Sequence, residues 1–225
     1  MTTKTIELYI DHKSPYAYLA VAPAWDLERD FDVSLDWLPY TLDIPDFLGS
    51  AEVADDGTVI AQNRTAHQWR RVKYSYMDVR RYANLRGLTI RGPQKIWDST
   101  LSGIGLLWAK KRGGERAYND IVYERFWQRA LDIEDCDVIE AVLQETGVDT
   151  DGFRAWAAGE GRALHDLIRA EAEDAGVFGV PTFVLDGELF WGREHLALIR
   201  LRLYELGLAR PGAKHPLETS HASRS

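Results

Sequence analysis

The residues best placed to do chemistry are Lys13 and Ser14, which lie where a strand pattern stops and a helical pattern begins. Ser14 can cap a helix with its hydroxyl while Pro15 takes the first helical position, where a missing N–H costs nothing. Free N–H groups and the positive end of the helix dipole gather at such a terminus, and Lys13 adds a charge. The position therefore favours an anion such as a thiolate or a carboxylate. The alternative is that Ser14 is an ordinary N-cap, since serine is among the commonest capping residues.

Cys136 is the only cysteine of the chain, so neither an internal disulfide nor a Cys-X-X-Cys pair can form. Redox chemistry by a dithiol is excluded. Three carboxylates surround Cys136 in the stretch 133–137, and they would raise the pKa of its thiol, so we expect it to be unreactive. The histidines show no ligand spacing with one another or with Cys136, and we therefore expect no metal site.

The composition indicates a soluble globular protein. The net charge of −8 and the pI near 5.3 argue against nucleic acid as a partner, because phosphate binding needs a basic face. No run is apolar for long enough to span a bilayer, so we expect no membrane partner. Residues 1–5 lack the charged and then apolar order of a secretory signal, which predicts a cytoplasmic location.

Two strands and a helix open the chain. Ile6, Leu8 and Ile10 alternate with polar residues, and Val33 to Tyr40 alternates in the same way, with the helix from Pro15 between them. Such a βαβ unit has parallel strands and a right-handed crossover. From Thr41 to Thr65 the pattern dissolves, and we interpret it as a long loop with one short turn.

Helical periodicity follows, and then strands return. The helices are expected at 66–86, 98–111, 115–130, 137–145 and 151–174. The aromatic stripes of the helices at 98–111 and 115–130 are interpreted as core, and the arginine-rich face of the helix at 66–86 is interpreted as solvated surface. Thr182 to Leu185 and Glu188 to Trp191 flank an Asp-Gly turn and predict an antiparallel hairpin, followed by a helix to Leu206. Residues 209–225 are expected to form a disordered tail.

The order of elements predicts an α/β protein with a thioredoxin-like fold, in which an all-helical domain is inserted between the βαβ and ββα halves. The thioredoxin-like domain would comprise residues 1–45 and 176–208, and the inserted helical domain residues 46–175. Two stretches, Asp11 to Ala20 and Gly176 to Phe183, together with Phe190-Trp191-Gly192, resemble the 2-hydroxychromene-2-carboxylate isomerases and the related kappa-class glutathione transferases. These are relatives of the DsbA-like thioredoxin branch.

The resemblance implies a glutathione cofactor and a set of residues for it. In redox members of this fold a cysteine holds the place of Ser14, so this chain resembles the branch that binds glutathione instead. Ser14 would then be the catalytic residue, whose hydroxyl donates a hydrogen bond to the glutathione thiolate. Pro181 resembles the cis-proline of the family, which turns the Val180 backbone toward the cofactor. The remaining cofactor residues implied are Asn63, Lys73 and Glu194, the last in place of an aspartate.

Three functions are compatible with these features. The first is a glutathione-dependent isomerase of aromatic keto acids, with Lys13, Tyr16 and Tyr76 as candidate substrate contacts. Lys13 or Lys73 would meet the carboxylate of the substrate, and Tyr16 could instead be a core aromatic. The second is a kappa-type glutathione transferase, in which the thiolate attacks an electrophile and stays attached. The third is a non-catalytic thioredoxin-fold binding protein. The resemblance also implies a homodimer.

Overall fold

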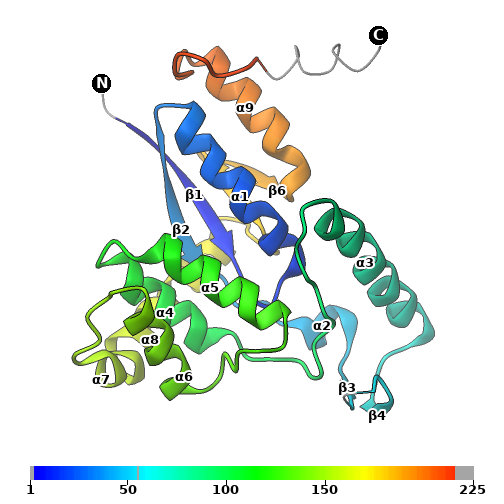
Figure 1. Cartoon of the computed structure of the whole chain (residues 1–225). Coiled ribbons are helices and arrows are strands. Elements are labelled where there is room, and N and C mark those ends of the chain that lie inside the picture. The colour runs from blue at the N-terminus through cyan, green and yellow to red at the C-terminus, as the bar shows by residue number, and fades with distance from the viewer. Residues whose placement is uncertain (1–2, 55, 216–225) are drawn as a thin grey trace.

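The computed structural model describes residues 3–54 and 56–215, and it shows a mixed α/β fold around a four-stranded sheet (Figure 1). The order of strands is β2-β1-β5-β6; β1 and β2 are parallel, and the other two neighbouring pairs are antiparallel. The strands are β1 (Lys4–Ile10), β2 (Val33–Pro39), β5 (Thr182–Leu185) and β6 (Glu188–Trp191). The parallel pair β1–β2 and the antiparallel pair β5–β6 are those that the sequence predicts, and the expected thioredoxin-like fold is confirmed.

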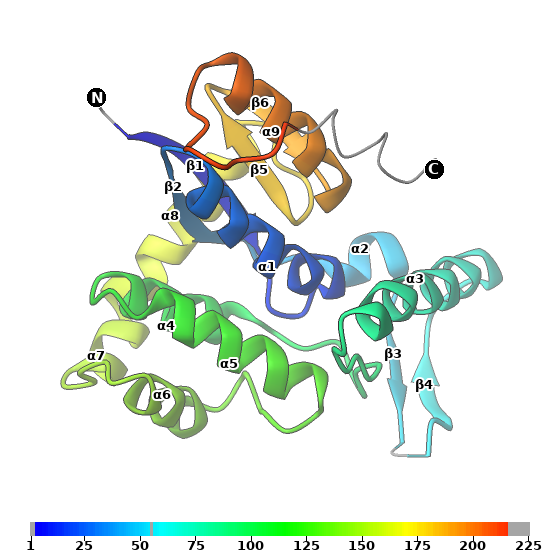
Figure 2. The same ribbon diagram turned by 45° about the horizontal axis from the view of Figure 1, so that its top comes forward.

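The sheet and its first helix follow from local sequence. Ile6, Leu8 and Ile10 of β1 are almost completely buried, as the alternating pattern requires. Helix α1 (Pro15–Asp30) begins directly after Ser14 and packs on β2. The C-terminal turn η1 (Arg193–His195) leads into α9 (Leu196–Glu205), which packs against α1. Figure 2 shows α1 and α9 together above the helical part of the molecule.

The helical region lies between β2 and β5 in the chain. Its helices are α3 (Ala66–Leu85), α4 (Thr100–Lys110), α5 (Glu115–Trp127), α6 (Cys136–Glu145), α7 (Phe153–Ala158) and α8 (Glu160–Asp174). Figures 1 and 2 show α3 standing apart from the group α4 to α8. Helices α4 and α8 pack on β2, so buried side chains of the sheet and of the helices form one continuous hydrophobic core. No helix within residues 3–54 and 56–215 has the length and apolar character that crossing a membrane requires.

The inserted region is not all-helical, which corrects the expectation. A short helix α2 (Ile44–Leu48) and a hairpin of β3 (Ala51–Val53) and β4 (Val59–Gln62) occupy the predicted loop. All four residues of β4 are exposed, so this strand has no buried face that could produce an alternating pattern. The long helix expected over 151–174 is also divided, because Gly159 separates α7 from α8.

The expectation that a disordered tail begins at residue 209 is wrong for its first residues. Ala209 pairs with Phe31 in an isolated antiparallel bridge, and the Arg210 N–H donates to the Asp30 carbonyl at 2.9 Å. The Asp32 N–H donates to Leu208 in the same way, at 2.8 Å. Backbone pairing therefore holds the first residues of this segment in place. The rest of the expected tail, residues 216–225, lies outside the described residues.

Candidate functional site

Ser14 caps α1 as the sequence predicts. Its side-chain oxygen accepts the Ala17 N–H at 3.3 Å, and its carbonyl accepts the Tyr18 N–H at 3.1 Å. The Ser14 N–H in turn donates to Asp11 at 2.9 Å, which closes the turn between β1 and α1. In the described part of the chain the Ser14 hydroxyl acts only as an acceptor, so its proton remains for a ligand. The Tyr16 N–H, in the first helical turn, also has no backbone acceptor there.

A buried ion pair supports this turn. The Lys13 ammonium lies 2.8 Å from the Asp11 carboxylate and donates to the Ser99 hydroxyl at 2.9 Å. Only 6% of the Lys13 side chain and none of that of Asp11 is exposed. Burial alone would raise the pKa of Asp11, but the Lys13 charge and hydrogen bonds, including one from the Leu42 N–H, lower it. Asp11 therefore stays ionised, and its carboxylate compensates the neighbouring Lys13 charge.

His12 holds the same turn from the inside. Its ring nitrogens lie 3.0 Å from the Ser102 hydroxyl and 3.0 Å from the Asn119 side-chain oxygen. Burial lowers the pKa of His12 to about 4, so the ring is neutral at neutral pH. The Tyr123 hydroxyl donates to the Asp11 carbonyl and the Trp127 indole donates to the His12 carbonyl, each at 3.2 Å. Side chains of α4 and α5 thus fix the backbone that presents Ser14.

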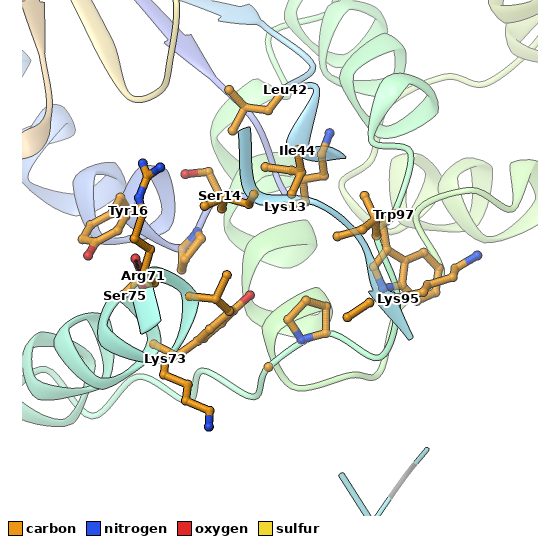
Figure 3. Close-up of a pocket in the computed structure, with 18 of the residues that line it drawn as sticks. Lys13, Ser14, Tyr16, Leu42, Ile44, Arg71, Lys73, Ser75, Lys95 and Trp97 are labelled. Atoms are coloured by element: carbon orange, nitrogen blue, oxygen red, sulfur yellow. Dashed lines mark hydrogen bonds between the residues drawn. The ribbon is translucent and has the colours of Figure 1, made fainter. Parts of the chain in front are cut away.

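Ser14 lines a cavity of about 780 Å³, which lies between α1, α3 and the segments 42–53, 92–97 and 178–180. Figure 3 shows Ser14 between Tyr16 and Arg71 on one side and Lys95 and Trp97 on the other. None of the described residues that line this pocket is an aspartate or a glutamate, although the whole chain carries a net charge of −8. The lining instead contains seven basic side chains, which are Lys13, Arg64, Arg71, Lys73, Arg80, Lys95 and Arg129. Such a pocket attracts anions.

The structure brings six of the predicted site residues to this one pocket, and these are Lys13, Ser14, Tyr16, Lys73, Tyr76 and Val180. The Lys73 side chain is exposed and extends away from Ser14 (Figure 3). The Tyr16 hydroxyl donates to Asp78 at 3.3 Å, and burial followed by the Asp78 charge raises the pKa of Tyr16. Tyr16 is therefore a wall of the pocket that is also tied to α3.

Val180 and Pro181 form the third side of the site. The peptide bond between them is cis, as the sequence resemblance implies. Val180 is buried and lines the pocket, whereas Pro181 does not belong to its described lining. Outside the helices and strands, no backbone hydrogen bond of Val180 is formed within the described residues. Its main-chain N–H and C=O are therefore available to an extended ligand.

Like Pro181, two further predicted residues do not line the pocket. Asn63 is exposed, and its side-chain oxygen accepts the Ser50 N–H at 2.6 Å, which ties the end of β4 to the chain before β3. Glu194 is also exposed, and its carboxylate folds back over Gly192, where a Cβ would lie 2.5 Å from both oxygens. Cys136 lies outside the pocket lining too, and burial with the nearby Glu140, Asp137 and Asp135 charges raises the pKa of its thiol against the opposing charge of Arg154.

Several pocket residues were missed from the sequence. Arg71 and Arg80 belong to the basic face of α3 that we interpreted as solvated, and Arg129 lies in a turn that gave no signal. The sequence of α3 contains a signal for its pocket residues. Lys73 and Arg80 share the helical face of Trp69, Val72 and Tyr76, which is otherwise apolar. Cations within an apolar stripe indicate a face that borders a polar cavity.

Comparisons with known proteins agree with this architecture. The chain is 28% identical over 206 residues to a 2-hydroxychromene-2-carboxylate isomerase of Sphingobium xenophagum, covering 90% of this chain and all of the relative. It is 26% identical over 198 residues to an enzyme of the same name from Pseudomonas putida, covering 86% and 91%. A solved 2-hydroxychromene-2-carboxylate isomerase shares the fold with a TM-score of 0.69 at 20% identity, covering 90% of this chain and 96% of that one.

The family itself is shown by a match over most of the chain. A family model described as a DSBA-like thioredoxin domain matches residues 5–203, which span the sheet, the helical region and the pocket between them. The chain therefore belongs to the DSBA-like thioredoxin family.

Proposed function

We propose that this chain is a glutathione-dependent isomerase of aromatic keto acids that activates the cofactor thiolate at Ser14. The observation that carries the proposal is the placement of a capping serine, with a free hydroxyl proton, where its helix terminus opens into a cationic pocket. The chain has one cysteine, outside that pocket, so the disulfide chemistry of redox thioredoxin folds has no second thiol. The relatives from Sphingobium xenophagum and Pseudomonas putida are both named as isomerases.

The residues of the pocket fit a thiol tripeptide. Val180 offers an unpaired main-chain donor and acceptor for an extended peptide, and the basic lining suits two carboxylates. Bound glutathione would supply a thiolate that adds reversibly to a conjugated carbon, so that a double bond becomes a rotatable single bond. The Ser14 hydroxyl and the Tyr16 N–H would donate to the sulfur, and the N-terminus of α1 would favour its negative charge.

The remaining side chains orient the acid. Lys13 lies beside Ser14 with its ammonium already held by Asp11 and Ser99, and Arg71 has no acidic partner among the described residues. Either can meet the carboxylate of a keto acid. Tyr16 and Trp97 lie on opposite sides of Ser14 and supply flat apolar walls for an aromatic ring (Figure 3). Thiolate, carboxylate and ring thus have separate places in one cavity.

The test is a calorimetric titration with reduced glutathione, compared between wild type and Ser14→Ala. We expect saturable binding that weakens in the variant, together with a higher pKa of the bound thiol, read from thiolate absorbance. Ser75→Ala is the matched control, because Ser75 also lines the pocket but its hydroxyl donates to the Arg71 carbonyl within α3. S-methylglutathione, which cannot ionise at sulfur, should bind wild type and Ser14→Ala alike.

Three results would overturn the proposal. If glutathione binds both proteins equally, with the thiol equally ionised, Ser14 has no part in activating sulfur. If turnover of an aromatic keto acid consumes glutathione, the chain is a conjugating transferase, because isomerisation leaves the amount of free glutathione unchanged. If glutathione binds and no aromatic keto acid is turned over, the binding-protein alternative replaces the isomerase.

A further inference from the structure

Two guanidinium groups meet at Gly92 without a carboxylate to neutralise them. The Arg80 Nε donates to the Ile90 carbonyl at 3.1 Å, and the Arg129 Nε donates to the Gly92 carbonyl at 2.8 Å. A Cβ built on Gly92 would lie 3.8 Å from Arg80 Nη2, so both groups lie against the same short segment. Neither arginine forms an ion pair in the described part of the chain. Both arginines are exposed, so solvent screens their mutual repulsion, but an anion at Gly92 would be attracted by both charges.

The Tyr76 hydroxyl belongs to the same place. The Arg80 guanidinium lies 5.6 Å from the centre of the Tyr76 ring, and Tyr76, Arg80 and Arg129 all line the pocket. Burial raises the pKa of Tyr76, while the charges of Arg64, Arg80 and Arg129 oppose that rise. The hydroxyl therefore stays protonated at neutral pH, and it has no hydrogen-bond partner within residues 3–54 and 56–215. It is a donor without an acceptor, beside two cations.

The backbone at Arg129 is also unusual. Its φ of 61° lies in the left-handed region, which residues other than glycine, asparagine and aspartate rarely adopt. The only other such residue in the described chain is Asp186, in the hairpin turn between β5 and β6. The Nε bonds of Arg80 and Arg129 anchor each side chain and leave both Nη atoms of each guanidinium free for a planar oxyanion.

We propose that Arg80, Arg129 and Tyr76 form an oxyanion subsite, separate from Ser14, which binds a second acidic group of the substrate. The inference rests on the proposed function and deepens it: the substrate is an aromatic keto acid that carries another carboxylate or similar oxyanion at its far end. The segment 92–97, which contributes Gly92 and Trp97, faces Tyr16 and Arg71 across the pocket (Figure 3). A ligand with an acid group at each end spans that gap.

The probe is isophthalate, an aromatic dicarboxylate, compared with benzoate, which has a single acid group. Binding is read from the fluorescence of the pocket tryptophans Trp69, Trp97 and Trp191. We expect wild type to prefer isophthalate over benzoate by about tenfold, because one charge-assisted contact contributes roughly 1.5–3 kcal/mol. Arg80→Met and Arg129→Gly should each abolish that preference, and Tyr76→Phe should reduce it.

The variants are chosen to separate binding from folding. Glycine adopts the φ of Arg129 without penalty, so Arg129→Gly should unfold at the temperature of wild type or above it. The matched control is Arg81→Met, which removes the neighbouring cation of α3, a largely exposed side chain outside the pocket lining. The control should keep the full preference for isophthalate.

The outcomes distinguish this subsite from the function on which it rests. No preference for isophthalate in wild type, or an undiminished preference in Arg80→Met and Arg129→Gly, overturns the subsite. So does an equal loss in Arg81→Met, which would mark a general effect of charge. If glutathione fails to bind while the arginine-dependent preference is present, the subsite stands and the proposed thiol chemistry falls. If glutathione binds at Ser14 but the preference is absent, the reverse holds.

Discussion

At the scale of single residues, Ser14 has two separable roles. Its oxygen caps α1 by accepting the Ala17 N–H, and its proton is free for a ligand. Asparagine also caps helices but has no hydroxyl. We therefore predict that Ser14→Ala lowers the free energy of unfolding by about 1 kcal/mol, whereas Ser14→Asn retains most of it. Urea denaturation measures the free energy of unfolding of both variants. An alanine variant as stable as wild type would show that the Ser14 cap contributes nothing to stability.

His12 makes folding sensitive to mildly acidic pH. Its pKa is lowered by burial from 6.5 to about 4, so the unfolded chain binds a proton there before the folded one does. The contribution of the neutral His12 ring to the free energy of unfolding is complete above about pH 6.5. It is lost as the pH falls toward 4, at about 1.4 kcal/mol per pH unit. Burial lowers the pKa of His165 as well, which acts in the same direction.

Two measurements check this prediction. The free energy of unfolding should fall between pH 7 and 5, and His12→Asn should show a shallower slope than wild type. A titration by nuclear magnetic resonance should find the His12 ring still neutral near pH 5. A His12 signal that titrates at its ordinary pKa would contradict the buried neutral ring. Asp11 does not confuse the comparison, because carboxylates change charge only at lower pH.

At the scale of elements, the sequence predicted those with a buried face and missed those without one. The alternation of Ile6, Leu8 and Ile10 predicts β1, and the Asp-Gly turn predicts the hairpin of β5 and β6. The fully exposed strand β4 shows no alternation, so its sequence predicts a loop. The apolar stripe of helix α3 meets two surroundings, because Val79 and Ala83 lie in the core whereas Trp69 and Tyr76 line the pocket. Periodicity identifies a helical face, but it does not say what that face meets.

Close packing between α4 and α5 positions the site indirectly. Gly105 lies on α4 where a Cβ would collide with the Tyr118 hydroxyl, which donates to the Ser102 carbonyl at 2.9 Å. Ser102 in turn contacts His12. We predict that Gly105→Ala lowers the free energy of unfolding by about 1–3 kcal/mol, because overpacking exceeds the gain in helix propensity.

Thermal or urea unfolding measures this change, with Gly159→Ala as the control. At Gly159 a Cβ meets only the Ala155 carbonyl, at 3.4 Å, so no steric collision is expected. Because the disturbance reaches His12 through Ser102, binding of glutathione to Gly105→Ala should weaken as well. Equal stability of Gly105→Ala and wild type would mean that α4 and α5 are less tightly packed than the contact distances indicate.

At the scale of the whole molecule, a cationic pocket lies in an anionic protein. The seven basic side chains of the lining are distributed over residues 13 to 129, so no linear stretch reveals them together. Spacing located Ser14, and the family resemblance located Val180 and Pro181. The arginines at 80 and 129 converge only through the turn at 90–92, a contact that tertiary structure creates and one sequence does not display.

This charge distribution predicts a strong dependence of ligand binding on salt. Raising the ionic strength from about 0.1 M to about 1 M shortens the Debye length from about 10 Å to about 3 Å. Association of glutathione or isophthalate should therefore slow markedly, because less of the attraction of the pocket reaches approaching anions. Stopped-flow fluorescence measures the rate. A rate independent of salt would show that the surrounding acidic surface cancels the field of the pocket.

The pairing of residues 208–210 with 30–32 has a consequence for self-association. Strand β2 is an edge of the sheet, and an open edge is a template on which another chain can add a strand. The Leu208 carbonyl and the Arg210 N–H use the backbone groups of Asp32 and Asp30 just before that edge begins. The end of the chain thereby protects one corner of the sheet against intermolecular strand addition and aggregation.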